Sequence, residues 1–141
     1  MESVIFACVH NAGRSQMAAA FFNALADPGR SRAVSAGTQP ADRVHPAVVE
    51  AMKEAGIDIA GSQPRRLTEE VARQAALLVT MGCGDECPYV PGLAREDWPL
   101  LDPAHRPLAE IREIRDEIRA RVSSLIESHG WARRASAASS R

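Results

Sequence analysis

The fold predicted for this chain follows from residues 3–20, which read Ser3-Val-Ile-Phe-Ala-Cys8-Val-His-Asn-Ala-Gly-Arg14-Ser-Gln-Met-Ala-Ala-Ala20. The apolar run at 4–6 is typical of a buried β-strand, and an alanine-rich run that favours a helix begins near Arg14. Cys8 lies between them, separated from Arg14 by five residues. The stretch therefore predicts a strand, a tight loop and a helix N-terminus, with a cysteine where the loop begins.

A loop that leads into a helix N-terminus can bind an anion. Its backbone N–H groups point inward, and the helix dipole adds partial positive charge at the same place. The planar guanidinium of Arg14 would hold a tetrahedral oxyanion through two parallel hydrogen bonds. The same field favours the thiolate of Cys8, which is the nucleophilic form. We therefore expect an oxyanion cradle made of Cys8, Val9, His10, Asn11, Ala12, Gly13, Arg14 and Ser15. Whether the side chain of His10 points into this cradle or away from it is left open.

Size and composition indicate one globular domain. The 141 residues can bury a sizeable core, and 45% hydrophobic with 25% charged residues is ordinary for such a protein. A net charge of −1 gives no reason to expect nucleic acid or a membrane surface as partner. No apolar run approaches the roughly 20 residues of a membrane span, and no cationic leader precedes the first strand. Three cysteines argue against a structural disulfide framework, so we expect a cytoplasmic protein with reactive thiols.

Strands and helices alternate along the chain. The expected helices span 14–25, 46–55, 68–74 and 108–128, and the expected strands span 4–6, 32–37, 75–81 and 96–98. This alternation predicts an α/β fold, with one four-stranded parallel sheet and helices on both faces. A single domain is expected over residues 1–130, followed by a disordered tail at 131–141 that is rich in Ala, Ser and Arg.

The carboxyl ends of parallel strands meet at one edge of the sheet, where ligands bind in such folds. Cys8 follows the first strand, Cys83 follows the strand at 75–81, and Asp102 follows the last strand. We therefore expect these three residues to gather there. Asp102 could act as a general acid, or it could only form a turn before Pro103.

Two chemistries fit a cysteine in an oxyanion cradle. In a phosphatase, Cys8 attacks phosphorus and a carboxylic acid such as Asp102 protonates the leaving group. In a reductase, a second thiol breaks the covalent adduct by attacking sulfur. Cys83 and Cys87 favour the reductase, because a phosphatase has no use for two thiols in a glycine-rich segment facing its nucleophile. Their Cα atoms would lie about 6 Å apart in a helix, near the outer limit for a disulfide.

A zinc site is the competing interpretation of the cysteines. Its ligands would be the three thiols and a histidine such as His10. Structural zinc sites usually contain two ligand pairs at short spacing, and this chain has only Cys83 and Cys87 as such a pair. The sequence therefore favours redox chemistry.

The segment from Cys8 to Ala18 resembles the phosphate-binding loop of the arsenate reductases built on the low-molecular-weight protein tyrosine phosphatase fold. Residues 79–88 resemble the redox segment of the thioredoxin-coupled members, and residues 97–103 are similar to the family's general-acid loop, with Asp102 at the acid position. The resemblance extends to about Ile126. It implies that Cys8 attacks arsenate and Cys83 then attacks Cys8 with release of arsenite. Cys87 would pair with Cys83, and thioredoxin would reduce that disulfide.

The resemblance also implies partners and alternatives. Arsenate would be the substrate, phosphate and sulfate would compete with it, and the protein would be a monomer without a cofactor. No metal is expected, since Ala19 stands where some members carry a glutamate that helps to bind potassium. The gap between Cys83 and Cys87 is shorter than in the best-known members. A low-molecular-weight tyrosine phosphatase, or a reductase that uses mycothiol or glutathione, remains the alternative function.

Overall fold

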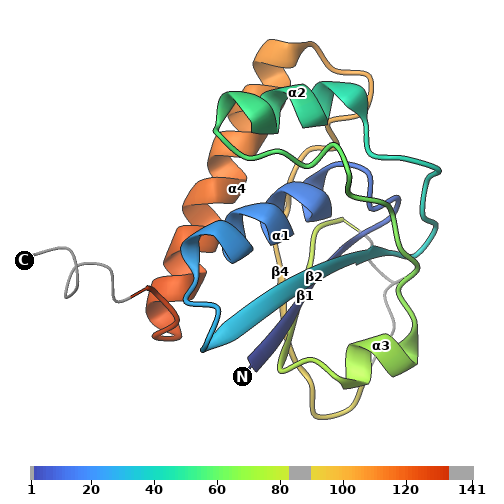
Figure 1. Cartoon of the computed structure of the whole chain (residues 1–141). Coiled ribbons are helices and arrows are strands. Elements are labelled where there is room, and N and C mark those ends of the chain that lie inside the picture. The colour runs from blue at the N-terminus through green and yellow to red at the C-terminus, as the bar shows by residue number, and fades with distance from the viewer. Residues whose placement is uncertain (1, 83–89, 134–141) are drawn as a thin grey trace, which may run out of the picture.

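Four parallel strands form the sheet at the centre of the molecule. The computed structural model describes residues 2–82 and 90–133 (Figure 1). The strand order is β2-β1-β3-β4, and the strands are β1 (Glu2–Cys8), β2 (Ser31–Gly37), β3 (Leu77–Thr80) and β4 (Ala94–Asp97). The predicted α/β fold with a four-stranded parallel sheet is confirmed. β4 begins two residues earlier than expected, because Ala94 and Arg95 are exposed at the sheet edge and give no apolar signal.

Helices cover both faces of the sheet, as the sequence predicted. They are α1 (Arg14–Leu25), α2 (Pro46–Glu54), α3 (Glu69–Arg73) and α4 (Leu108–Ser128). In Figure 1, α1, α2 and α4 lie on one face and α3 lies on the other. Thr68 caps α3, because its side chain accepts a hydrogen bond from the backbone N–H of Val71 at 3.1 Å.

Strand β1 is buried from Val4 to Cys8 and pairs with a strand on each side. Val4 and Phe6 face the larger core beneath α1 and α4, while Ile5 and Ala7 face the smaller core beneath α3. The Phe6 ring lies 5.9 Å from Phe22 and 5.7 Å from Trp98, measured between ring centroids. Strands on both sides and helices on both faces therefore fix the position at which β1 ends.

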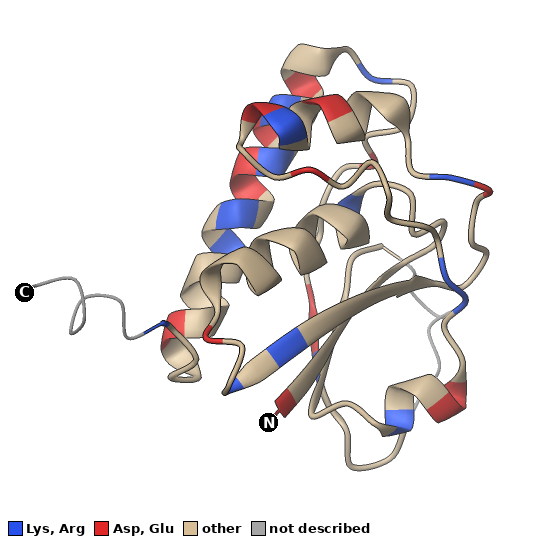
Figure 2. Ribbon diagram, viewed as in Figure 1, with Lys and Arg blue, Asp and Glu red and all other residues tan. Residues whose placement is uncertain are grey.

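The outer surface of α4 carries interleaved positive and negative charges, as is typical of a solvated helix face (Figure 2). Arg112 and Arg115 both reach Glu54 of α2, at 2.7 and 3.2 Å. These ion pairs hold α4 against α2 on the side of the molecule away from the sheet. Among the described residues, no helix is both long enough and apolar enough to cross a membrane.

The chain remains packed after α4 ends. The Trp131 side chain is 9% exposed and its ring lies 5.8 Å from Phe22. Its carbonyl accepts a hydrogen bond from the Asp27 N–H at 2.8 Å, and Ala132 forms an antiparallel bridge with Ala26. The predicted domain boundary at residue 130 falls before these contacts. Residues 134–141 of the predicted tail lie outside the described residues.

Shortening the chain tests how much this packing contributes. A chain that ends at Gly130 loses the Trp131 ring, and we expect its free energy of unfolding to fall by about 3 kcal/mol, as for a large aromatic residue removed from a core. A chain that ends at Arg133 keeps the contact and serves as the matched control. Urea unfolding of both variants measures the difference, and equal stability would contradict the assigned role of Trp131.

Candidate active site

The loop between β1 and α1 turns its carbonyl groups outward. The carbonyls of residues 8–12 all accept hydrogen bonds of 2.8–3.2 Å, and the donors are the backbone N–H groups of Thr38, Gln39, Ala41 and His45 and the side chain of Gln16. Among the described residues, the backbone N–H groups of residues 9–15 have no hydrogen-bond acceptor. Such a set of unpaired donors at a helix N-terminus is suited to binding an anion.

Cys8 lies at the floor of this loop and is 2% exposed. Its Sγ is 2.9 Å from Ser15 Oγ, and Ser15 Oγ also accepts a hydrogen bond from Asn11 Nδ2 at 2.7 Å. Asn11 has a φ of 50°, in the left-handed region that asparagine tolerates better than most residues. Ser15 has one hydroxyl hydrogen, and the bond from Asn11 leaves that hydrogen free for Cys8.

Arg14 is the first residue of α1 and is 8% exposed. Its Nη1 donates to the Leu100 carbonyl at 3.2 Å, and its Nη2 lies 3.7 Å from Asp102 Oδ2. The other oxygen of Asp102 accepts a hydrogen bond from the Ala104 N–H at 2.9 Å. Asp102 therefore forms the turn that the sequence allowed, and it also faces the guanidinium. The structure brings Cys8, Arg14 and Asp102 to the same edge of the sheet.

Gly82, at the start of the glycine-rich segment, is a neighbour of Arg14 that the sequence did not reveal. It has a φ of +103°, and a Cβ atom placed there would overlap Arg14 Nη1. The preceding residue, Met81, donates its N–H to the Ala7 carbonyl at 2.7 Å and so extends the sheet pairing. The positive φ favours glycine at this position, and the backbone runs directly against the guanidinium. No short sequence pattern reveals this contact, since Gly82 and Arg14 are far apart in the chain.

His45 is a second neighbour of the loop that the sequence did not reveal. Its N–H holds the Ala12 carbonyl at 3.0 Å. Burial lowers the pKa of its imidazole; the charges of His10 and His105 lower it further, and Asp102 opposes these effects. Burial thus favours the neutral form of the His45 imidazole. His10 itself is exposed, and its carbonyl is one of those held outward.

Cys83 and Cys87 lie outside the described residues, so the redox disulfide stays a prediction. Within residues 2–82 and 90–133, no group of three or more His, Cys, Asp or Glu side chains could hold a metal ion. Two ligands of the alternative zinc site are those same cysteines, and this alternative therefore awaits metal analysis.

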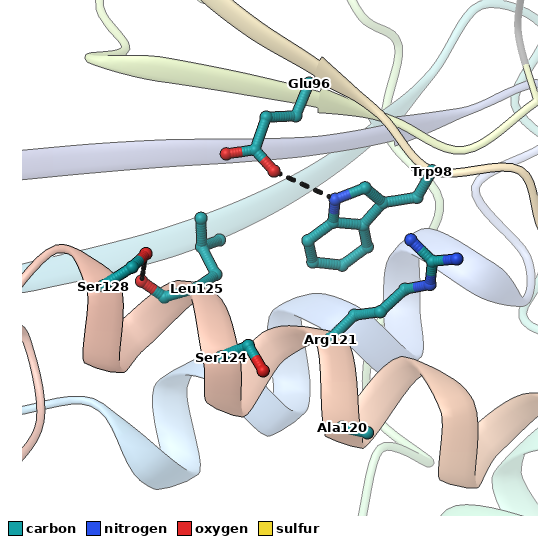
Figure 3. Close-up of a pocket in the computed structure, with 7 residues that line it drawn as sticks. All are labelled: Glu96, Trp98, Ala120, Arg121, Ser124, Leu125 and Ser128. Carbon is teal, nitrogen blue, oxygen red and sulfur yellow. Dashed lines mark hydrogen bonds between the residues drawn. The ribbon is translucent and has the colours of Figure 1, made fainter.

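A separate pocket of about 420 Å³ lies between β4 and α4 (Figure 3). Its lining residues are Glu96, Trp98, Ala120, Arg121, Ser124, Leu125 and Ser128, and none of them was predicted as a site residue. Trp98 donates its indole N–H to Glu96 at 3.1 Å, and Arg121 pairs with Glu117 at 3.0 Å. The charged groups at this pocket thus already have partners.

The loop follows a central parallel strand, has a cysteine at its floor and presents unpaired N–H groups. This combination is typical of a class of proteins that bind oxyanions. The sequence model of the low molecular weight phosphotyrosine protein phosphatases matches residues 3–134. The chain therefore belongs to the low molecular weight phosphotyrosine protein phosphatase family.

Many of its relatives carry another activity in their names. Arsenate reductase 2 of Staphylococcus epidermidis is 35% identical over 127 residues, covering 87% of this chain and 95% of that protein. The glutaredoxin arsenate reductase of Synechocystis is 35% identical over 129 residues, covering 89% of this chain and 97% of that protein. The solved structure of a thioredoxin-dependent arsenate reductase of Corynebacterium glutamicum matches with a TM-score of 0.78 and 40% identity. That match covers 91% of this chain and 61% of the solved chain.

Replacing Gly82 tests its contact with Arg14. In the Gly82→Ala variant the new methyl group displaces the guanidinium. We therefore expect phosphate to protect Cys8 from iodoacetamide about tenfold less well, which is the effect of losing one charge-assisted hydrogen bond. Peptide mass spectrometry measures the alkylation of Cys8 alone.

Gly92→Ala is the matched control. Gly92 also has a positive φ, +83°, but a Cβ atom placed there would have nothing within 4 Å. Both variants carry backbone strain, and only Gly82→Ala should lose phosphate protection. Equal protection in the two variants would contradict a role for Gly82 in placing Arg14.

Proposed function

We propose that this protein reduces arsenate to arsenite, with Cys8 as the nucleophile and the thiols of Cys83 and Cys87 as its internal electron source. The observation that supports this proposal best is the packing of Gly82 on Arg14 beside the cradle. Gly82 immediately precedes Cys83 in the sequence. The segment with the second and third thiols thus starts at the predicted oxyanion site, where a phosphatase would not need it.

The reaction divides among the three thiols. The Cys8 thiolate attacks arsenic, and an oxygen of arsenate leaves as water after protonation. The Cys83 thiolate then attacks Cys8 Sγ, the electron pair of the sulfur–arsenic bond passes to arsenic, and arsenite departs. Cys87 attacks Cys83 in the resulting Cys8–Cys83 disulfide, which frees Cys8 and leaves a Cys83–Cys87 disulfide.

Arg14 and Asp102 have separate roles in this proposal. Arg14 and the N–H groups of the cradle hold the charged oxygens, and Ser15 donates its hydrogen to the Cys8 thiolate. Asp102 protonates the departing oxygen, and its carboxyl group lies near the guanidinium that would bind the same anion. Phosphate and sulfate are expected to compete for this site because they are tetrahedral oxyanions of similar charge.

An external dithiol must reduce the Cys83–Cys87 disulfide after each turnover. We propose thioredoxin, in keeping with the thioredoxin-dependent relative from Corynebacterium glutamicum. Glutaredoxin is the alternative that the Synechocystis relative suggests. The protein would then act as a cytoplasmic monomer in arsenic detoxification.

A tyrosine phosphatase is the second candidate function, and the family to which the chain belongs favours it. Cys8, Arg14 and Asp102 would serve that reaction equally well, because it also needs a nucleophile, an oxyanion cradle and a general acid. The two functions differ in their need for Cys83 and Cys87. Hydrolysis of p-nitrophenyl phosphate, measured beside arsenate reduction, separates them.

Cysteine variants test the division of labour. We expect Cys8→Ser to abolish arsenate reduction, because a hydroxyl group is a poor nucleophile without a strong base. Cys83→Ser should also stop arsenite release, yet it should keep any hydrolysis of p-nitrophenyl phosphate. Oxidation of NADPH in the presence of thioredoxin and thioredoxin reductase measures the reaction. Arsenate reduction by Cys83→Ser at the wild-type rate would contradict the cascade.

Cys87→Ser should behave differently from both. It should complete one turnover and stop with a Cys8–Cys83 disulfide, which mass spectrometry of non-reduced peptides detects. If this variant instead turns over at the wild-type rate with thioredoxin, Cys87 is dispensable and the proposed relay through it is wrong.

Metal analysis distinguishes the enzyme from a zinc-binding protein. We expect the purified protein to contain zinc far below one equivalent and to retain its unfolding temperature in the presence of a chelator. Stoichiometric zinc that protects all three cysteines from alkylation would overturn the reductase proposal.

A further inference from the structure

Gln16 forms hydrogen bonds to the loop between β1 and α1. It lies in the first turn of α1 and is 5% exposed. Its Nε2 is 3.0 Å from the Asn11 carbonyl, 3.2 Å from Asn11 Oδ1 and 3.3 Å from the Gln63 carbonyl. All three neighbours are acceptors, so the nitrogen of the Gln16 amide, and not its oxygen, must face them.

The orientation of the Asn11 side chain follows from its other partner. The backbone N–H of Arg65 donates to Asn11 Oδ1 at 2.9 Å. A backbone N–H can only donate, so the Asn11 oxygen must face Arg65 and Gln16. The nitrogen of the same amide then faces Ser15 Oγ, 2.7 Å away.

This orientation decides where the Ser15 hydrogen goes. Ser15 accepts from Asn11 and so directs its only hydrogen to Cys8 Sγ, 2.9 Å away. With the Asn11 amide reversed, its oxygen would face Ser15 and would take that hydrogen away from the sulfur. Reversal would also set the Asn11 nitrogen against the donors of Gln16 and Arg65, which buried donors avoid.

We propose that Gln16 is a positioning residue that fixes the direction of the hydrogen bond from Ser15 to Cys8. It acts through Asn11. The Gln16 amide is the second donor to Asn11 Oδ1, and it also donates to the backbone carbonyl of Asn11, whose φ is positive. The inference rests on the proposed role of Cys8 as the nucleophile. It requires neither arsenate nor the other two cysteines.

Gln16→Met is the variant that tests the proposal. Methionine has a similar length and no donor, so the Asn11 amide is held by Arg65 alone. At neutral pH we expect Cys8 to react with iodoacetamide about tenfold more slowly, because the thiolate loses part of its hydrogen bond. At strongly alkaline pH, where the thiol ionises without help, the two rates should become equal.

Asn23→Ala is the matched control for a merely structural effect. Asn23 lies on the same helix, and its side chain bonds both the N–H and the carbonyl of Ala33 at 2.9 Å. This variant should lower the unfolding temperature and leave the alkylation of Cys8 unchanged at every pH. If Asn23→Ala slows alkylation as much as Gln16→Met does, general loosening of α1 explains both and the proposal fails.

A double-variant cycle with Ser15→Ala shows whether Gln16 acts through Ser15. In the Ser15→Ala background, Gln16→Met should cause no further loss of alkylation rate, since the hydrogen that it directs is gone. A further tenfold loss of alkylation rate would overturn the proposal. A Gln16→Met single variant whose Cys8 reacts at the wild-type rate would also overturn it. If Gln16→Met does not fold, Gln16→Glu replaces it, because its carboxylate also lacks a donor and the same loss is expected.

Failure of this inference can be told apart from failure of the proposed function. Alkylation of Cys8 is measured without arsenate and without an electron donor. If the protein reduces no arsenate but its Gln16→Met variant shows slower alkylation of Cys8, the inference stands and the proposed function fails. If the protein reduces arsenate but Cys8 of its Gln16→Met variant is alkylated at the wild-type rate, only the inference fails.

Discussion

The hydrogen bonds that hold the carbonyls of residues 8–12 outward are the interaction on which the rest of the site depends. A peptide group that turns its carbonyl out turns its N–H in, and the donors of residues 9–13 therefore remain available beside those of Arg14 and Ser15 at the helix N-terminus. Their partners come from the segment after β2 and from α1, so the loop cannot change shape without breaking contacts in both. An anion that binds there would recover the hydrogen bonds that folding leaves unmade.

The fold supplies the rigid support for this loop. β1 is buried from Val4 to Cys8 and is paired on both sides, which fixes the floor of the cradle. The segment after β4 is anchored by Trp98. Its backbone N–H donates to the Thr80 carbonyl at 2.8 Å, and its ring packs on Phe6. From that anchor the chain reaches Leu100 and Asp102, the two groups that contact Arg14. The Cys8 thiol, the Arg14 guanidinium and the Asp102 carboxyl group are thus placed by one core.

Local patterns were sufficient to predict the parallel sheet and the residues of the loop, because the strand, the turn and the helix start follow one another in the chain. The contacts that orient these residues could not be predicted in the same way. Gly82 against Arg14 and Arg65 against Asn11 join segments far apart in the sequence, and both use backbone atoms. Neither composition nor spacing shows which distant side chain a backbone segment will meet. Trp131 was missed for a different reason: an isolated aromatic residue in a polar, alanine-rich terminus gives no periodic signal.

The central claim is that the electrons for arsenate reduction come from the protein's own thiols, and a single-turnover experiment tests it most directly. Fully reduced protein, freed of all external thiol, is mixed with arsenate, and arsenite and free thiols are counted together. The account predicts stoichiometric arsenite with the loss of two of the three cysteine thiols, and the recovered disulfide should join Cys83 to Cys87. Protein that releases no arsenite and keeps all its thiols, while it hydrolyses p-nitrophenyl phosphate, would contradict the account.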